Sequence, residues 1–129
     1  MAHGSNRPLS PHLQIYRLPF TALTSVFHRA TGVALSAGTL LLVAWLVAAA
    51  LGAETLSAFQ TLLGTPIGLL VLLGWSFSLF YHLAAGIRHL VWDAGRAFDN
   101  AGIDTGAWAV IVASVALTAV AWVAALYPL

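Results

Sequence analysis

Three long stretches without a charged residue dominate the chain. They comprise 24 residues between Arg29 and Glu54, 33 residues between Glu54 and Arg88, and the 25 residues after Asp104. Each stretch exceeds the roughly 20 apolar residues that an α-helix needs to cross the hydrocarbon core of a bilayer. The pattern therefore predicts an all-α integral membrane protein with three transmembrane helices. These spans are expected near residues 30–51, 67–90 and 106–127.

Two segments rich in polar residues, glycine and proline separate the predicted spans. Residues 52–66 and residues 93–105 are each expected to form a turn. The composition agrees with a membrane protein, because 60% of the residues are hydrophobic and only 7% are charged, whereas soluble domains contain about 25% charged residues. We interpret residues 1–129 as one membrane domain that contacts the lipid bilayer, and we expect no nucleic-acid partner.

The five basic residues, all arginines, predict the orientation of the chain in the membrane. Three precede the first span and two lie at or after the end of the second span: Arg7, Arg17, Arg29, Arg88 and Arg96. Because arginine-rich flanks stay in the cytoplasm, the N-terminus is expected inside and the C-terminus outside. The chain has no cysteine, which excludes disulfides, thiolate metal sites and iron–sulfur ligands.

Residues 1–20 are expected to form a cytoplasmic or interfacial segment. Ser10 and Pro11 resemble a helix N-cap followed by proline at the first helical position, which predicts a short interfacial helix over residues 12–17. After Pro19 a new helix is expected to begin near Thr21 and to continue into the first span.

The sequence also indicates whether the chain carries a cleavable signal peptide or a transit peptide. Small residues at 48–53 resemble a signal-peptide cleavage region, but the long segment before the first span and the two later spans argue against cleavage. We see no transit segment rich in arginine and serine, and this favours a bacterial inner membrane over the mitochondrial inner membrane.

A stripe of polar and small residues runs along the start of the first span. Ser25, Arg29, Gly32 and Ser36 follow a spacing that places them on one helical face, and His28 lies on the adjoining face. One interpretation is a helix-packing stripe in which Arg29 extends to lipid headgroups. The alternative is a pocket in which a hydroxyl and a guanidinium bind a carbonyl or carboxylate ligand.

The second span contains His82 below the predicted cytoplasmic surface, with Gly86 and His89 on the same helical face. An ionisable residue inside a membrane is by default a candidate functional residue. Imidazole is a common haem ligand, and a glycine one turn away leaves room for a flat ring. The alternative is that His82 hydrogen-bonds a neighbouring helix and Gly86 serves helix packing.

Three further residues near the end of this span have simpler interpretations. Arg88 and His89 fit the positively charged end of a span, and Asp93 has the spacing for local pairing with His89 or Arg96.

A six-coordinate haem needs two axial ligands, and only His82 lies deep in a span. If His82 binds haem, we therefore expect the second ligand to come from another subunit.

Two motifs resemble those of a known family. They are Ser-Val-Phe-His-Arg-Ala-Thr-Gly at residues 25–32, preceded by Arg-Pro-Leu at 7–9, and His-x-x-x-Gly-Ile-Arg-His-x-x-Trp-Asp-x-Gly at 82–95. The chain resembles the cytochrome b membrane-anchor subunit of succinate dehydrogenase, respiratory complex II, over essentially its whole length. This resemblance implies a haem-binding helical bundle that is shared with a second small anchor subunit.

The resemblance also implies roles for individual residues. His82 would be one axial ligand of the iron of haem b, Ser25 and Arg29 would line the ubiquinone site, and His28 and Arg29 would contact the haem propionates. Gly86, Arg88, His89 and Asp93 belong to the motif and would support the site.

The family's succinate chemistry belongs to a flavoprotein subunit and an iron–sulfur subunit, so this chain would be an enzyme subunit without catalytic residues of its own. The complex would act in the tricarboxylic acid cycle and the respiratory chain. Two alternatives stay open, namely a structural anchor without haem and the anchor of a fumarate reductase. A proton- or ion-translocating subunit is disfavoured, because the predicted spans contain no carboxylate.

Overall fold

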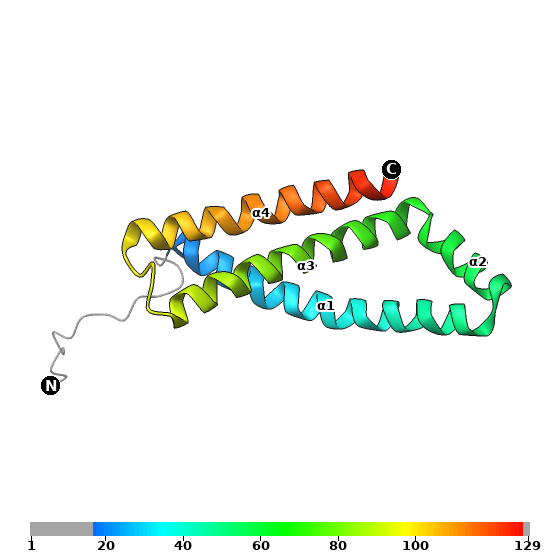
Figure 1. The fold of residues 1–129 in the computed structure, drawn as a ribbon. Helices are drawn as coiled ribbons and strands as arrows, with labels where there is room; N and C mark the ends of the chain where they lie inside the picture. The colour runs from blue at the N-terminus through cyan, green and yellow to red at the C-terminus, as the bar shows by residue number, and fades with distance from the viewer. Residues whose placement is uncertain (1–16, 128–129) are drawn as a thin grey trace, which may run out of the picture.

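The computed structural model describes residues 17–127, which form four α-helices (Figure 1). They are α1 (Phe20–Leu51), α2 (Ala53–Leu63), α3 (Pro66–Asp93) and α4 (Asn100–Leu126). Of these, α1, α3 and α4 are long and apolar enough to cross a membrane. The predicted all-helical membrane fold with three spans is therefore confirmed.

The first helix confirms one expectation of the sequence in detail. It begins at Phe20, directly after Pro19, and continues without a break through the first predicted span. Its 32 residues correspond to about 48 Å at 1.5 Å per residue, whereas the hydrocarbon core measures about 30 Å. The predicted interfacial helix over 12–17 lies outside the described residues, apart from Arg17, which is not helical.

Both expected turns are shorter than predicted. Residues 53–63 form the helix α2, because this segment consists mainly of good helix formers. Gly52 separates it from α1 with a φ of 120°, a backbone conformation that glycine adopts without steric cost. The second turn covers only 94–99, because Asp99 accepts a hydrogen bond from the Gly102 amide at 3.1 Å and caps α4.

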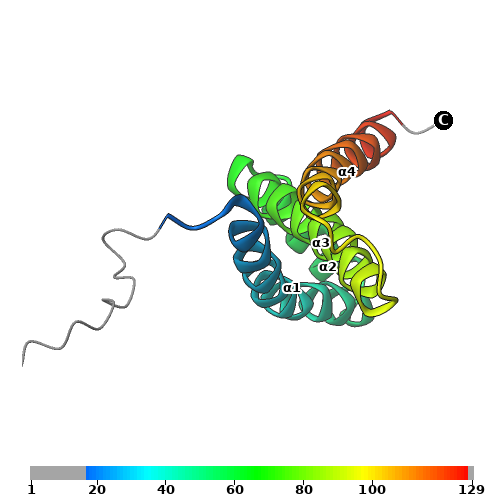
Figure 2. The same cartoon turned by 90° about the vertical axis from the view of Figure 1, so that its left-hand side faces the viewer.

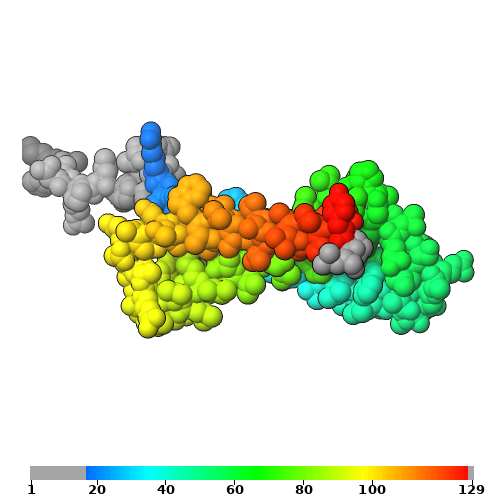
Figure 3. All heavy atoms as spheres, turned by 45° about the horizontal axis from the view of Figure 1, so that its top comes forward, coloured from blue at the N-terminus to red at the C-terminus, as the bar shows by residue number. Residues whose placement is uncertain are grey.

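The helix α3 lies between α1 and α4 and packs against both (Figures 1 and 2). Its buried core consists of Tyr81 and Ala85, which pack with Val110 of α4. Most other large apolar side chains are exposed, as expected where lipid covers the helices. The space-filling view shows α4 lying along the bundle (Figure 3).

Buried hydroxyl groups in the spans are satisfied within their own helices. Ser78 donates a hydrogen bond to the carbonyl of Gly74, Ser114 to that of Val110 and Thr118 to that of Ser114. Each hydroxyl therefore enters the bundle without an unpaired donor. Small residues at these positions also let neighbouring helices approach closely.

Candidate functional site

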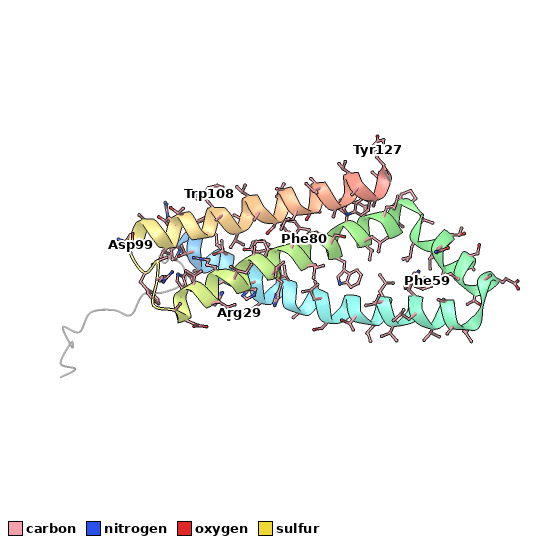
Figure 4. All side chains as sticks on the ribbon, in the orientation of Figure 1. Arg29, Phe59, Phe80, Asp99, Trp108 and Tyr127 are labelled. Carbon is pink, nitrogen blue, oxygen red and sulfur yellow. The ribbon has the colours of Figure 1, made fainter. Side chains whose placement is uncertain are left out.

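The start of α1, the end of α3 and the start of α4 meet at one end of the bundle (Figure 4). We call this the arginine end, because Arg29, Arg88 and Arg96 lie there. The opposite end, where α2 joins α1 to α3, is called the α2 end. Every site residue predicted within the described chain lies toward the arginine end, which is where the sequence had placed them.

The imidazole of His82 is fastened to α1 through one of its two ring nitrogens. Its Nδ1 lies 3.1 Å from the carbonyl oxygen of His28 and 3.3 Å from Oγ1 of Thr31. A carbonyl oxygen can only accept a hydrogen bond, so Nδ1 carries the proton in this arrangement. The Nε2 atom of the neutral ring then keeps its lone pair, which is the form that binds a metal ion.

Three imidazoles from α1 and α3 form a row at the arginine end. The ring of His28 lies between the other two, with its centroid 4.2 Å from that of His82 and 4.9 Å from that of His89. His89 is held by a hydrogen bond of 2.8 Å from Nδ1 to the carbonyl of Ala85. The Nε2 atom of His28 is buried and has no hydrogen-bond partner among the described residues.

Two glycines shape the surroundings of His82. A Cβ atom at Gly32 would lie only 3.1 Å from Cε1 of His82, so a larger residue there would require the imidazole to shift by a few tenths of an ångström. A Cβ atom at Gly86 would meet nothing within 4 Å. The surface of α3 one turn from His82 is therefore open, which fits the predicted space for a flat ring.

The predicted polar stripe of α1 is only partly turned toward the bundle. Ser25 is half-buried, Arg29 is exposed and Ser36 is exposed, while Gly32 faces His82. Within residues 17–127 no hydrogen bond joins Ser25 or Arg29 to the three histidines. His28, from the adjoining face, is the α1 histidine that reaches α3.

Arg88 has an environment that sequence reasoning missed. Its side chain is only 7% exposed, although the sequence suggested an ordinary basic residue at the end of a span. Its Nη1 donates to Oγ1 of Thr24 at 3.0 Å, and its Nη2 donates to the carbonyl of Ile103 at 3.3 Å. The guanidinium also lies 4.2 Å from the ring centroid of Trp92, which is a cation–π contact.

Tyr81 extends this network by donating a hydrogen bond of 3.1 Å to the carbonyl of Thr24. Arg88 and Tyr81 of α3 therefore both bind the first turns of α1, and Arg88 also binds α4. One sequence feature could have indicated this shared environment: Arg88 follows Tyr81 by seven residues, which places both on one helical face. Asp93 is the exposed last residue of α3, and its local pairing stays a prediction.

The donor set fits a single axial ligand better than a metal ion held by several side chains. Among residues 17–127, no group of three or more His, Cys, Asp or Glu side chains is arranged to hold a metal ion. His82 instead offers one lone pair on Nε2 from a ring that is fixed through Nδ1. A porphyrin iron needs such an imidazole together with space for a flat macrocycle, which Gly86 leaves open.

Comparison with known proteins identifies a family over almost the whole chain. A family model described as succinate dehydrogenase/fumarate reductase transmembrane subunit matches residues 3–121. The succinate dehydrogenase cytochrome b556 subunit of Paracoccus denitrificans is 44% identical over 112 residues, which cover 87% of this chain and 86% of the relative.

Two further relatives have somewhat lower identity. The cytochrome b556 subunit of Rickettsia felis succinate dehydrogenase is 38% identical over 119 residues, covering 92% of this chain and 93% of that protein. The cytochrome b560 subunit of Reclinomonas americana is 36% identical over 127 residues, with 92% of this chain and 85% of the relative covered. The range matched by the family model contains both sequence motifs, the whole of α1 and α3, and most of α4.

Proposed function

The chain belongs to the family of succinate dehydrogenase and fumarate reductase transmembrane subunits, and on this basis we propose that it binds haem b and helps form a ubiquinone-reducing site. It is a multi-pass membrane protein that is similar to the cytochrome b subunits of succinate dehydrogenase. In this function it anchors a flavoprotein subunit and an iron–sulfur subunit to a bacterial inner membrane. Succinate oxidation takes place in those soluble subunits.

The observation that carries the proposal is the fixed imidazole of His82. Its Nδ1 is bound to the carbonyl of His28, so the Nε2 lone pair is available for iron. A ligating histidine in proteins usually donates its other ring N–H to a carbonyl, carboxylate or water, which sets the tautomer and the ring orientation. The open backbone surface at Gly86 accommodates the macrocycle beside the ligand.

Haem b, when bound, supplies one-electron transfer between the soluble redox centres and the quinone site. His82 is the only histidine of the described chain whose Nδ1 is fixed by a neighbouring helix. A second ligand for the haem iron would therefore come from a second small anchor subunit. Arg29, exposed at the arginine end, and His28, whose Nε2 has no partner in the described residues, are the groups that bind the propionates.

The ubiquinone site uses the exposed guanidinium of Arg29 and the hydroxyl of Ser25. A quinone carbonyl oxygen gains negative charge as the quinone is reduced, and a fixed cation with a hydroxyl donor stabilises that charge. Both residues lie on the first turns of α1, at the end of the bundle where the soluble subunits dock. This placement keeps the quinone headgroup close to the electron donor.

The haem assignment is tested by the visible spectrum of the purified complex. We expect the wild-type complex to show a low-spin haem and His82→Ala to lose that spectrum while the subunits stay assembled. A low-spin haem that persists in His82→Ala would contradict the assignment. Absence of haem from the wild-type complex would favour the alternative of a purely structural anchor.

A further inference from the structure

The contact between α1 and the His82 ring depends on Thr31 and Gly32, which are consecutive residues of α1. Thr31 is 6% exposed, and its hydroxyl donates a hydrogen bond of 2.8 Å to the carbonyl of His28. The same Oγ1 atom lies 3.3 Å from Nδ1 of His82. Because the hydroxyl proton already points to the carbonyl, Oγ1 has a free lone pair for the Nδ1 proton.

The carbonyl oxygen of His28 and the hydroxyl oxygen of Thr31 therefore both accept from the N–H at Nδ1 of His82. The carbonyl of His28 lies at 3.1 Å and the Thr31 hydroxyl at 3.3 Å from Nδ1, so the N–H is shared between them. Gly32 makes this geometry possible, since a Cβ atom there would lie 3.1 Å from Cε1 and 3.6 Å from Nδ1. Contacts at 3.1 Å are tight enough that the ring would have to move.

We infer that Thr31 and Gly32 are positioning residues for the His82 ligand, with Gly32 setting the distance of the imidazole from α1 and Thr31 holding the proton on Nδ1. This inference rests on the proposed role of His82. A hydrogen bond from Nδ1–H makes the imidazole a more basic ligand. A more basic ligand stabilises ferric iron over ferrous iron, so these two residues lower the midpoint potential of the haem.

The test uses the whole purified complex carrying Thr31→Val, Thr31→Ser or Gly32→Ala. The haem midpoint potential is measured by redox titration, and the ferric low-spin haem is examined by electron paramagnetic resonance. We expect Thr31→Val to raise the midpoint potential, because it removes an acceptor and a polar group, and Thr31→Ser to restore the wild-type value. Gly32→Ala should raise the potential and shift the largest g value, because the ring plane turns.

Matched controls on the same helix separate positioning from packing. Thr39→Val makes the same chemical change at an exposed threonine whose hydroxyl bonds to the carbonyl of Leu35. Gly38→Ala introduces a Cβ that overlaps the indole of Trp75 and so disturbs packing between α1 and α3 away from His82. Both controls should keep the wild-type potential and g values.

The possible outcomes are distinct. Wild-type potential and g values in both Thr31→Val and Gly32→Ala, in a complex whose haem is lost with His82→Ala, would overturn the inference and leave the proposed function intact. A low-spin haem that survives His82→Ala would overturn both. Loss of haem in Thr31→Val but not in Thr31→Ser would support the inference, because serine keeps the hydroxyl that contacts Nδ1 of His82 and valine removes it.

Discussion

The two ends of the bundle are held together by different kinds of contact. At the arginine end, Arg88 and Tyr81 of α3 bind Thr24 of α1, and Arg88 also reaches the backbone of α4. Toward the α2 end, α1 and α3 move apart and α2 connects them (Figure 1). There the indole of Trp75 packs into the notch left by Gly38 and its Nε1 has no hydrogen-bond partner in the described chain.

This difference sets the end of the molecule that carries the proposed site apart from the end where α2 joins α1 to α3. Polar groups are expensive in a bilayer and persist where they bind one another or a ligand. At the arginine end, a buried arginine binds across helices near a row of three histidines, whereas the buried hydroxyls of Ser114 and Thr118, farther along the bundle, bond within α4. We therefore expect substitutions at the arginine end to change cofactor and quinone chemistry, and those at the α2 end to change packing alone.

The largest contrast is expected between two glycines of α3. A Cβ atom at Gly86 or at Gly74 would meet nothing within 4 Å of the chain, so either alanine variant should fold. Under the proposed function, Gly86→Ala would place a methyl group on the surface left open for the macrocycle and should abolish haem binding, whereas Gly74→Ala should retain it. The haem content per complex, measured from the pyridine haemochrome, checks this. Full haem content in Gly86→Ala would show that the open surface is not the haem face.

A second contrast concerns quinone reduction. Removing one preorganised donor from a site of developing negative charge slows a reaction by on the order of 10²-fold, and we expect Arg29→Ala to depress ubiquinone reductase activity on that scale. Succinate oxidation with an artificial acceptor should persist. The control is Glu54→Gln in the first turn of α2, which should leave both activities unchanged. Equal loss of both activities in Arg29→Ala would indicate misassembly.

The smallest expected effect is on stability. Arg88→Gln removes a buried cation that binds α1, α4 and an indole ring, and we expect the complex to lose about 1–3 kcal/mol of stability. Arg96 is exposed, so Arg96→Gln should change stability by less than about 0.5 kcal/mol. Thermal unfolding of the detergent-purified complex measures both variants. Equal unfolding temperatures would show that the buried network contributes nothing to the arginine end.

The three spans could be predicted from the sequence because hydrocarbon excludes charge, and charge-free stretches are visible without any structure. The helix α2 was missed because Gly52, Gly64 and Pro66 indicated a turn. The 11 residues between the two glycines nevertheless form a helix, with Glu54 in the first turn, where a negative charge is favourable. The helix-forming residues and Glu54 were visible in the sequence, but the two glycines and the proline led to the prediction of a turn.

The candidate site residues could be named from the sequence, but their contacts could not. The positions of His28 and Arg29 differ by about 100° around α1, and only the packing of α1 on α3 decides which of them meets His82. The burial of Arg88 depends on Thr24 and Ile103, which are distant in sequence. The hydrogen bond from His82 to a backbone carbonyl leaves no trace in the sequence, since every residue has a carbonyl.

The central claim is that iron binds Nε2 of His82, and exogenous ligand rescue tests it most directly. In the purified complex, His82→Gly leaves a gap of imidazole size beside α1, and added imidazole can occupy the vacated coordination position. We expect the low-spin haem spectrum to be lost in His82→Gly and to return as imidazole is titrated, with no such response in the wild-type complex. A low-spin spectrum in His82→Gly before imidazole is added would contradict the claim.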